Sequence, residues 1–467
     1  MNEQEQTATT EPSTSVQNRR QPFPQGFRDT ISTGWAERPE VNPPARDQAP
    51  YAAARRASVS AAFPGKRLVV PAGEPAVRSN DTDYPFRAHS AFAHLTGWGS
   101  DAEPGAVLVF DPTDEGHAVT LYFRERAGRE TSEFYSDASI GEFWIGPRPS
   151  LEQTAAELGV ATDHLDAFVA SEDDLTVGAD DALTSFVSEL RLVKDEYEID
   201  ELRRAVAVTA DGFDDVILAL PQAIAHARGE RIVEGAFHLR ARSDGNWEGY
   251  DTIAASGPHA TYLHWTRNDG AVAPGDLILI DAGTEVDSLY TADITRTLPV
   301  NGTFTEIQRR VYETVREAAD AAFAAARPGV AFRTIHEAAM QVIAHRVAEW
   351  GLLPVTAEEA LDADAGGQHR RYMVHGTSHH LGIDVHDCAQ ARREMYYDGL
   401  LEPGMVFTIE PGLYFQADDV TVPEEYRGIG VRIEDDILMT AEGPVNLSAD
   451  IPRTADDVEA WMRRLIG

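Results

Sequence analysis

Four carboxylates end or interrupt apolar stretches in the second half of the chain, and this placement constrains the fold more than any other feature. Asp281 ends the run "LILID" and Glu410 closes "MVFTIE". Asp293 and Glu434 stand within the strand-like runs "SLYTADITRTLPV" and "VRIEDDILM". Ionised carboxylates in such positions are costly to bury unless they are paired or bound to metal. A site built from all four would need about four positive charges, which two divalent ions would supply.

A cluster of histidines lies between these carboxylates in the sequence. The stretch "VHGTSHHLGIDVHDC" contains His375, His379, His380 and His386. Taken alone, the stretch could be a chance cluster of surface histidines, a metal site or a proton-handling site. Because the histidines and the four carboxylates all fall within residues 281–434, a metal site is favoured.

An arginine accompanies the last carboxylate. If "GIGVRIEDDILMT" is one strand, its period of two places Arg432 and Glu434 on the same face. The two side chains would then project into the same space. The alternative is an ordinary Arg/Glu pair on a sheet surface.

Length and composition limit the function classes. The 467 residues predict two domains. A net charge of −37 disfavours nucleic acid and anionic membranes as partners, and no apolar run approaches the ~20 residues of a spanning helix. Cys388 is the single cysteine, and the N-terminus lacks signal-peptide features, so a soluble, cytoplasmic protein is expected. The scarcity of lysine (Lys66 and Lys194 alone) is compatible with salt adaptation, although a GC-rich genome is the favoured explanation.

The chain divides into three expected segments. Residues 1–50 predict a polar, proline-rich tail, in which Phe23, Phe27 and Trp35 suggest docking on a neighbour. Residues 51–190 alternate strand-like runs such as "KRLVVPAG" and "GAVLVFDP" with helical ones such as "SLEQTAAELG", which indicates an α/β domain.

Residues 191–467 predict an α+β domain. It opens on a long amphipathic helix that is expected to stop at Pro221. Two further helices, "FTEIQRRVYETVREAADAAFAAA" and "FRTIHEAAMQVIAHRVAEW", are separated by the stop signal "RPG". Paired strands surround them.

Two local motifs resemble catalytic signatures and are interpreted as decoys. "HEAAM" at 336–340 starts like a zinc-protease helix but has Met340 where the second histidine must stand, so His336 is a helix-face histidine. "GTSHH" at 376–380 resembles a nucleophile elbow but ends in His380 instead of glycine, so Ser378 is not expected to be a nucleophile.

Five motifs in order, "LIDAG", "ADITRT", "HGTSHHLGIDVHD", "VFTIEPG" and "YRGIGVRIEDD", together resemble the metal-binding motifs of the aminopeptidase P and prolidase family of pita-bread metallopeptidases. The upstream piece "NDTDYPFRAHSAFAHLTGW" looks like the N-terminal domain of bacterial aminopeptidase P. The resemblance implies a creatinase/aminopeptidase P-type α/β domain followed by an α+β pita-bread catalytic domain.

Carried over residue by residue, the resemblance implies five metal ligands. Asp281 would hold one ion, His379 and Glu410 the other, and Asp293 and Glu434 both. Four oxygen donors, one imidazole and no thiolate independently suit Mn²⁺ better than a structural zinc. Two Mn²⁺ ions are therefore expected.

The resemblance also implies catalytic roles. Glu410 would act as ligand and proton shuttle. His264, His375 and His386 would contact the substrate and stabilise developing charge, and Arg432 would orient Glu434 or a relay water. His380 is expected to be a packing or pocket-wall residue, and Cys388 to be structural.

The implied function is an Xaa-Pro aminopeptidase that releases the N-terminal residue of peptides with a penultimate proline, in a homodimer or homotetramer. A prolidase restricted to Xaa-Pro dipeptides is the nearest alternative, because it would share all five ligands. Methionine aminopeptidase would not explain the additional domain. A non-catalytic binding module and a metal-free creatine hydrolase-like enzyme are less compatible with a complete ligand set.

Overall fold

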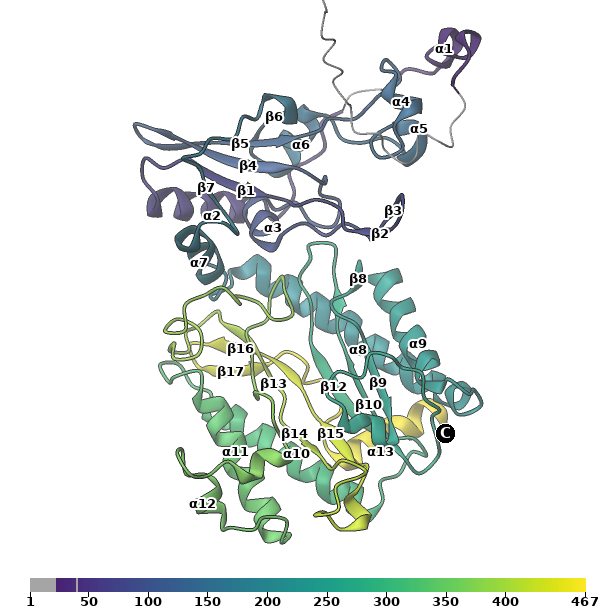
Figure 1. The fold of residues 1–467 in the computed structure, drawn as a ribbon, viewed down its shortest axis with the longest axis vertical. Helices are drawn as coiled ribbons and strands as arrows, with labels where there is room; N and C mark the ends of the chain where they lie inside the picture. The colour runs from purple at the N-terminus through teal and green to yellow at the C-terminus, as the bar shows by residue number, and fades with distance from the viewer. Residues whose placement is uncertain (1–21, 39–40) are drawn as a thin grey trace, which may run out of the picture. The chain divides into compact units, whose positions relative to one another are not determined.

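The computed structural model describes residues 22–38 and 41–467, and the chain divides into two compact units between Thr176 and Val177 (Figure 1). The division comes earlier than the expected boundary at residue 190, because the helix that follows it belongs to the second unit. At the end of that helix, Glu189 pairs with Arg392 of the second unit at 2.6 Å.

The first unit is built on a five-stranded sheet in the order β6-β5-β4-β1-β7. The strands expected at "KRLVVPAG" and "GAVLVFDP" are confirmed as β1 and β4, which pair antiparallel. Leu68 of β1 and Leu108 and Phe110 of β4 are fully buried. The strands are β1 (Leu68–Pro71), β4 (Val107–Thr113), β5 (Gly116–Phe123), β6 (Ala161–His164) and β7 (Leu175–Thr176).

Helices contact this sheet. The helix expected at "SLEQTAAELG" is confirmed: Ser150 and Gln153 form a capping box at its start, and Gly159 ends it in the left-handed conformation, with φ +60°. The helices that contact the sheet are α2 (Ala49–Ala62), α3 (Ser90–Thr96) and α6 (Leu151–Leu158).

The aromatic residues of the expected tail pack within the first unit. Phe23 and Phe27 stack at 4.9 Å, and both meet the edge of Tyr135. Trp35 meets Phe134 at 6.0 Å. The described part of the predicted tail, residues 22–38, therefore packs through its aromatic side chains on Phe134 and Tyr135; residues 1–21 and 39–40 of that segment lie outside the described residues. The helices involved are α1 (Gln25–Ile31) and α4 (Glu133–Ser136).

The second unit begins with helices. The long amphipathic helix is confirmed, but it continues through Pro221 instead of stopping there. Leu220 and Ala223, on either side of the proline, are buried, and the packing of this helix on the next one offsets the missing backbone hydrogen bond. The helices are α7 (Asp181–Glu189), α8 (Glu196–Ile224) and α9 (Gly229–Asp244).

Small antiparallel sheets carry the rest of this unit. One has the order β12-β10-β9, another β13-β16-β17, and β14 pairs with β15. The two helices expected on either side of "RPG" are confirmed as α10 and α11. The bounds are β9 (Ile253–Ser256), β10 (Leu277–Ala282), β12 (Ile294–Pro299), α10 (Glu306–Ala325), α11 (Thr334–Glu349), β13 (Val406–Ile409), β14 (Gly412–Tyr414), β15 (Gly430–Arg432), β16 (Asp435–Thr440), β17 (Gly443–Asn446) and α13 (Ala455–Ile466).

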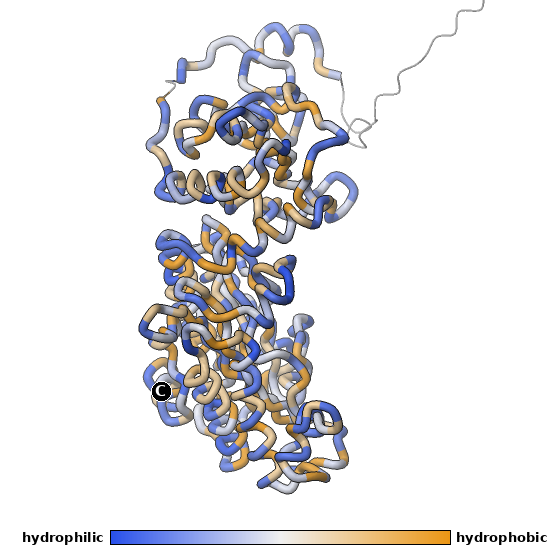
Figure 2. The backbone as a smooth tube through the Cα atoms, turned by 90° about the vertical axis from the view of Figure 1, so that its left-hand side faces the viewer, coloured by the Kyte–Doolittle hydropathy of each residue, from blue (hydrophilic) through white to orange (hydrophobic). Residues whose placement is uncertain are grey.

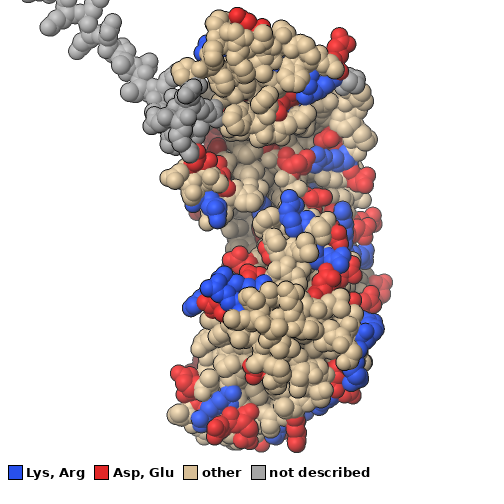
Figure 3. Space-filling model, turned by 90° about the vertical axis from the view of Figure 1, so that its right-hand side faces the viewer, with Lys and Arg blue, Asp and Glu red and all other residues tan. Residues whose placement is uncertain are grey.

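Hydrophobic and hydrophilic segments alternate along the backbone (Figure 2). Within the described part of the chain, no helix is long and apolar enough to cross a membrane. On the face drawn in Figure 3, basic side chains are interspersed among acidic ones.

Candidate active site

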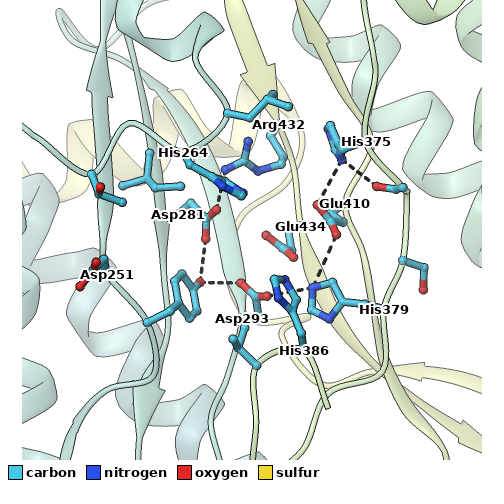
Figure 4. A pocket seen from close by; sticks show the side chains of 17 residues that line it. Asp251, His264, Asp281, Asp293, His375, His379, His386, Glu410, Arg432 and Glu434 are labelled. Carbon is cyan, nitrogen blue, oxygen red and sulfur yellow. Dashed lines mark hydrogen bonds and ion pairs between the residues drawn. The ribbon is translucent and has the colours of Figure 1, made fainter. Parts of the chain in front are cut away.

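A cavity of about 570 Å³ in the second unit brings the predicted site residues together. Every residue singled out as a ligand or catalytic group lines it (Figure 4): His264, Asp281, Asp293, His375, His379, His386, Glu410, Arg432 and Glu434. These residues come from strands and loops far apart in the sequence, so the tertiary fold is what assembles the site.

The first two carboxylates come from neighbouring strands. Asp281 lies in β10, opposite Thr295 of β12, and Asp293 stands immediately before β12. The hydroxyl of Tyr250 lies 2.7 Å from Oδ1 of Asp281 and 2.5 Å from Oδ1 of Asp293. Because the hydroxyl has one proton, it donates to one carboxylate at a time, and Tyr250 is therefore a donor that Asp281 and Asp293 share. Sequence reasoning missed this tyrosine, because "EGYD" carries no pattern that distinguishes it from other tyrosines.

Asp293, His379 and Glu434 form the group best placed to hold a metal ion, with one ligand atom of each within 4.8 Å of the others. The Nε2 atom of His379 lies 3.2 Å from Oδ2 of Asp293 and 3.6 Å from Oε1 of Glu410. Its Nδ1 atom lies 3.2 Å from the carbonyl of His380. When Nδ1 donates to that carbonyl, the lone pair of Nε2 faces the carboxylates, which is the tautomer a metal requires.

Glu434 does not lie inside a strand, so the sequence interpretation of "GIGVRIEDDILMT" as one strand is wrong. β15 ends at Arg432 and pairs with β14, whereas β16 begins at Asp435 and pairs with β13. Glu434 lies where the chain passes from one sheet to the other. Its N–H donates to the carbonyl of Thr295 at 3.1 Å.

Arg432 reaches Glu434 through a threonine. Its Nη2 lies 2.5 Å from Oδ2 of Asp281, and its Nε donates to Oγ1 of Thr295 at 3.1 Å. That hydroxyl donates in turn to Oε2 of Glu434 at 2.7 Å. The arginine also contacts the hydroxyl of Tyr414 at 3.2 Å. It therefore fixes one ligand candidate directly and another through Thr295.

The electrostatics of the cavity indicate a shortage of positive charge. Burial raises the pKa of Glu434, and the charges of Asp293 and Glu410 raise it further. Burial raises the pKa of Glu410 to about 7 despite the neighbouring His379. Burial also raises the pKa of Asp281, although Arg432 opposes the shift. Divalent cations fit this donor set, because they would replace protons as the counter-charge.

The pKa of His379 shows the same excess of negative charge in the cavity. Burial lowers its pKa, but the hydrogen bond to Asp293 and the charge of Glu410 outweigh burial and raise the pKa to about 9. The carboxylates therefore favour a positive charge at this position.

The other histidines surround this cluster. Nδ1 of His375 lies 3.5 Å from Oε2 of Glu410, and Nε2 lies 2.8 Å from the hydroxyl of Tyr414. Burial lowers the pKa of His375 to about 3, with Arg432 adding to the shift, so its ring is neutral at physiological pH. The ring of His386 lies 4.6 Å from that of His379. Burial lowers the pKa of His386 too.

His264 is exposed on a loop that a buried carboxylate holds in place. Oε1 of Glu230 accepts from the N–H of Ser256 at 2.9 Å and lies 2.7 Å from Nδ1 of His259. Its Oε2 accepts from Nε1 of Trp265 at 2.9 Å and from the N–H of Gly270 at 2.6 Å. Glu230, in the first turn of α9, therefore clamps both ends of the loop that carries His264. Sequence reasoning missed it among the many acidic residues.

The remaining histidine-stretch residues have other environments. His380 is buried, stacks on Phe332 at 4.5 Å and does not line the catalytic cavity, as expected of a packing residue. Ser378 lines the cavity, but its Oγ atom is buried without a hydrogen-bond partner among the described residues, so no base activates it. Cys388 is buried.

Comparisons with known proteins agree with this site. Metallopeptidase family M24 matches residues 200–441, and the aminopeptidase P N-terminal domain matches residues 52–176. The chain therefore belongs to metallopeptidase family M24, and its fold class, an aminopeptidase P-type N-terminal domain followed by a pita-bread catalytic domain, is confirmed.

Individual relatives cover almost the whole chain. Xaa-Pro aminopeptidase 1 of Streptomyces coelicolor is 50% identical over 463 residues, which cover 94% of this chain and 92% of the relative. The Xaa-Pro aminopeptidase of Escherichia coli is 34% identical over 441 residues, covering 87% of this chain and 96% of the relative. Zinc-substituted E. coli aminopeptidase P in complex with product superposes with a TM-score of 0.77 at 30% identity, covering 91% of this chain and 100% of that one.

Proposed function

We propose that the protein is an Xaa-Pro aminopeptidase, a metallo-exopeptidase that removes the N-terminal residue from peptides with a penultimate proline. The observation that carries this proposal is the convergence of Asp281, Asp293, Glu410 and Glu434 with His379 in one cavity. The similarity to Xaa-Pro aminopeptidases over both units supports the substrate class.

Two divalent ions would occupy the carboxylate cluster. Asp281 would hold one, His379 and Glu410 would hold the other, and Asp293 and Glu434 would contribute to both. Oxygen-rich ligands with one imidazole suit Mn²⁺. When bound, such ions supply Lewis-acid polarisation of the scissile carbonyl and activation of a water.

The protein's own groups would handle protons and orientation. Glu410 would carry a proton from the attacking water to the proline nitrogen, which is tertiary in the substrate and must be protonated to leave. His386 and His264 would hydrogen-bond the carbonyl oxygen as it gains charge, and neutral His375 would position the peptide beyond the scissile bond. Arg432, bound to Asp281 and Thr295, would keep the ligand geometry fixed.

Peptide length separates this function from that of a prolidase. The experiment compares release of the N-terminal residue from an Xaa-Pro-Xaa tripeptide and from an Xaa-Pro dipeptide by the manganese-loaded enzyme. Cleavage of the tripeptide supports the aminopeptidase, whereas cleavage confined to the dipeptide contradicts it in favour of a prolidase. The cytoplasmic location and the homodimeric or homotetrameric state expected from the sequence remain predictions, to be checked by fractionation and by light scattering.

A further inference from the structure

A second, smaller cavity adjoins the catalytic one. Its volume is about 210 Å³, the size of roughly one amino-acid residue, and it shares His375, Gly376 and Ser378 with the catalytic cavity. The rest of its lining comes from the start of α11, from the short helix η4 (Gln368–Arg371) and from the loop before β13: Phe332, Arg333, His336, Arg370, Thr377 and Tyr397.

The wall that the two cavities share has no side chain at Gly376. A Cβ atom built on Gly376 would meet nothing nearer than the carbonyl oxygen of Ser378, at 4.0 Å. Ser378 lines both cavities, and its Oγ atom is buried without a hydrogen-bond partner among the described residues. The absence of a side chain at Gly376 therefore leaves room for the main chain of a peptide between the two cavities.

The charge of the second cavity is opposite to that of the first. Arg333 and Arg370 line it and no carboxylate does, although the whole chain carries a net charge of −37. Burial lowers the pKa of His336, and the charge of Arg370 lowers it further, so this arginine acts on the interior of the cavity.

Arg370 is the more available of the two arginines. Arg333 already pairs with Asp398 at 2.8 Å. Arg370 has a 3.4 Å contact with the carbonyl of Val374, and within residues 22–38 and 41–467 it has no carboxylate partner. Its sequence neighbour Arg371 differs: it forms two 2.8 Å hydrogen bonds to Asp419 and does not line the cavity.

We propose that this cavity binds the residue after the penultimate proline of a short peptide, with the guanidinium of Arg370 paired to the free terminal carboxylate. The inference rests on the proposed function, because it places the leaving part of an Xaa-Pro-Xaa substrate. Proline restricts the direction in which the chain continues, since its φ is fixed near −65°. A carboxylate leaving the catalytic cavity past His375 and Gly376 then meets the positive wall.

The test compares an Xaa-Pro-Xaa tripeptide acid with its C-terminal amide, using the metal-loaded enzyme. A charge-assisted hydrogen bond at a partly exposed site corresponds to about a tenfold effect. Wild-type enzyme is expected to show a kcat/KM about tenfold higher for the acid. Arg370→Gln should lower kcat/KM for the acid to the level of the amide and leave the amide unchanged.

Arg371→Gln is the matched control, because it removes an adjacent arginine of the same helix that faces Asp419. It should preserve the preference for the acid. Equal cleavage of acid and amide by the wild type would overturn the subsite, as would an equal loss on both substrates in Arg370→Gln. Failure of the wild type to cleave acid, amide or longer Xaa-Pro peptides would overturn the proposed function together with the subsite.

Discussion

Lys194 and Asp387 form a buried ion pair, with Nζ 3.0 Å from Oδ2, that ties the segment before α8 to the histidine loop. Arg191 completes it with Nε 2.9 Å from Oδ1 of the same carboxylate. Asp387 directly follows His386, and its N–H donates to the carbonyl of His380 at 2.9 Å. The pair therefore fixes the loop that places His379 and His386 in the cavity.

Replacing this lysine is expected to be strongly destabilising. Lys194→Met leaves part of a buried carboxylate uncompensated and should lower the free energy of unfolding by about 3–5 kcal/mol. Lys66→Met, at the other lysine, which is exposed, is the control and should change it by less than about 0.5 kcal/mol. Urea unfolding measures both; equal effects of the two substitutions would contradict a structural role for the ion pair.

The ion pair at Asp387 also makes the free energy of unfolding depend on pH in the acidic range. Burial alone would raise the pKa of Asp387, but Lys194 and Arg191 outweigh burial and hold the pKa below its usual range. A carboxylate with a lowered pKa in the folded state contributes stability above its unfolded pKa of about 4, and that stability is lost as pH falls further. Asp387→Asn should flatten the decline in unfolding free energy as the pH falls below about 4. If the unfolding free energy of the variant falls with pH as steeply as that of the wild type, Asp387 is not the source of this dependence.

Glu230 is expected to act on catalysis through His264. Glu230→Gln replaces acceptor atoms with an NH₂ group that faces N–H donors, so the loop should shift and kcat should fall about tenfold. A double-mutant cycle separates this role from a general loss of stability. In the His264→Ala background the glutamine substitution should have little further effect on kcat; a full additive loss there would show that Glu230 acts elsewhere.

Glu410 carries the proton transfer in the proposed mechanism. Glu410→Gln keeps the size of the side chain but removes its basicity, so kcat should fall by about 10²–10⁴. The tripeptide assay checks this, with the melting temperature as a control for folding. A variant that remains folded and keeps wild-type turnover would refute the assignment.

The sequence predicted the composition of the site better than its geometry. The four carboxylates stood out because they lie against apolar runs, and the structure brings them together with His379. Tyr250 and Thr295, which link the carboxylates, could not be predicted, because their roles arise from pairing between strands and loops that are distant in sequence.

The predicted helix and strand boundaries were wrong where tertiary contacts outweigh the local preference of the sequence. Pro221 signalled the end of a helix, yet packing carries α8 on to Ile224. "GIGVRIEDDILMT" has the alternation of one strand, but Glu434 lies where the chain leaves one sheet for another. A pattern of period two cannot reveal a change of hydrogen-bonding partner.

The most direct test of the account is the metal dependence of tripeptide cleavage. The enzyme is stripped with a chelator, and release of the N-terminal residue from an Xaa-Pro-Xaa tripeptide is measured before and after Mn²⁺ is added, alongside the metal content of the protein. The account predicts no turnover in the stripped enzyme and restored turnover at about two bound ions per chain, the number that offsets four carboxylates. Full activity in metal-free protein, or no cleavage after reloading, would contradict it.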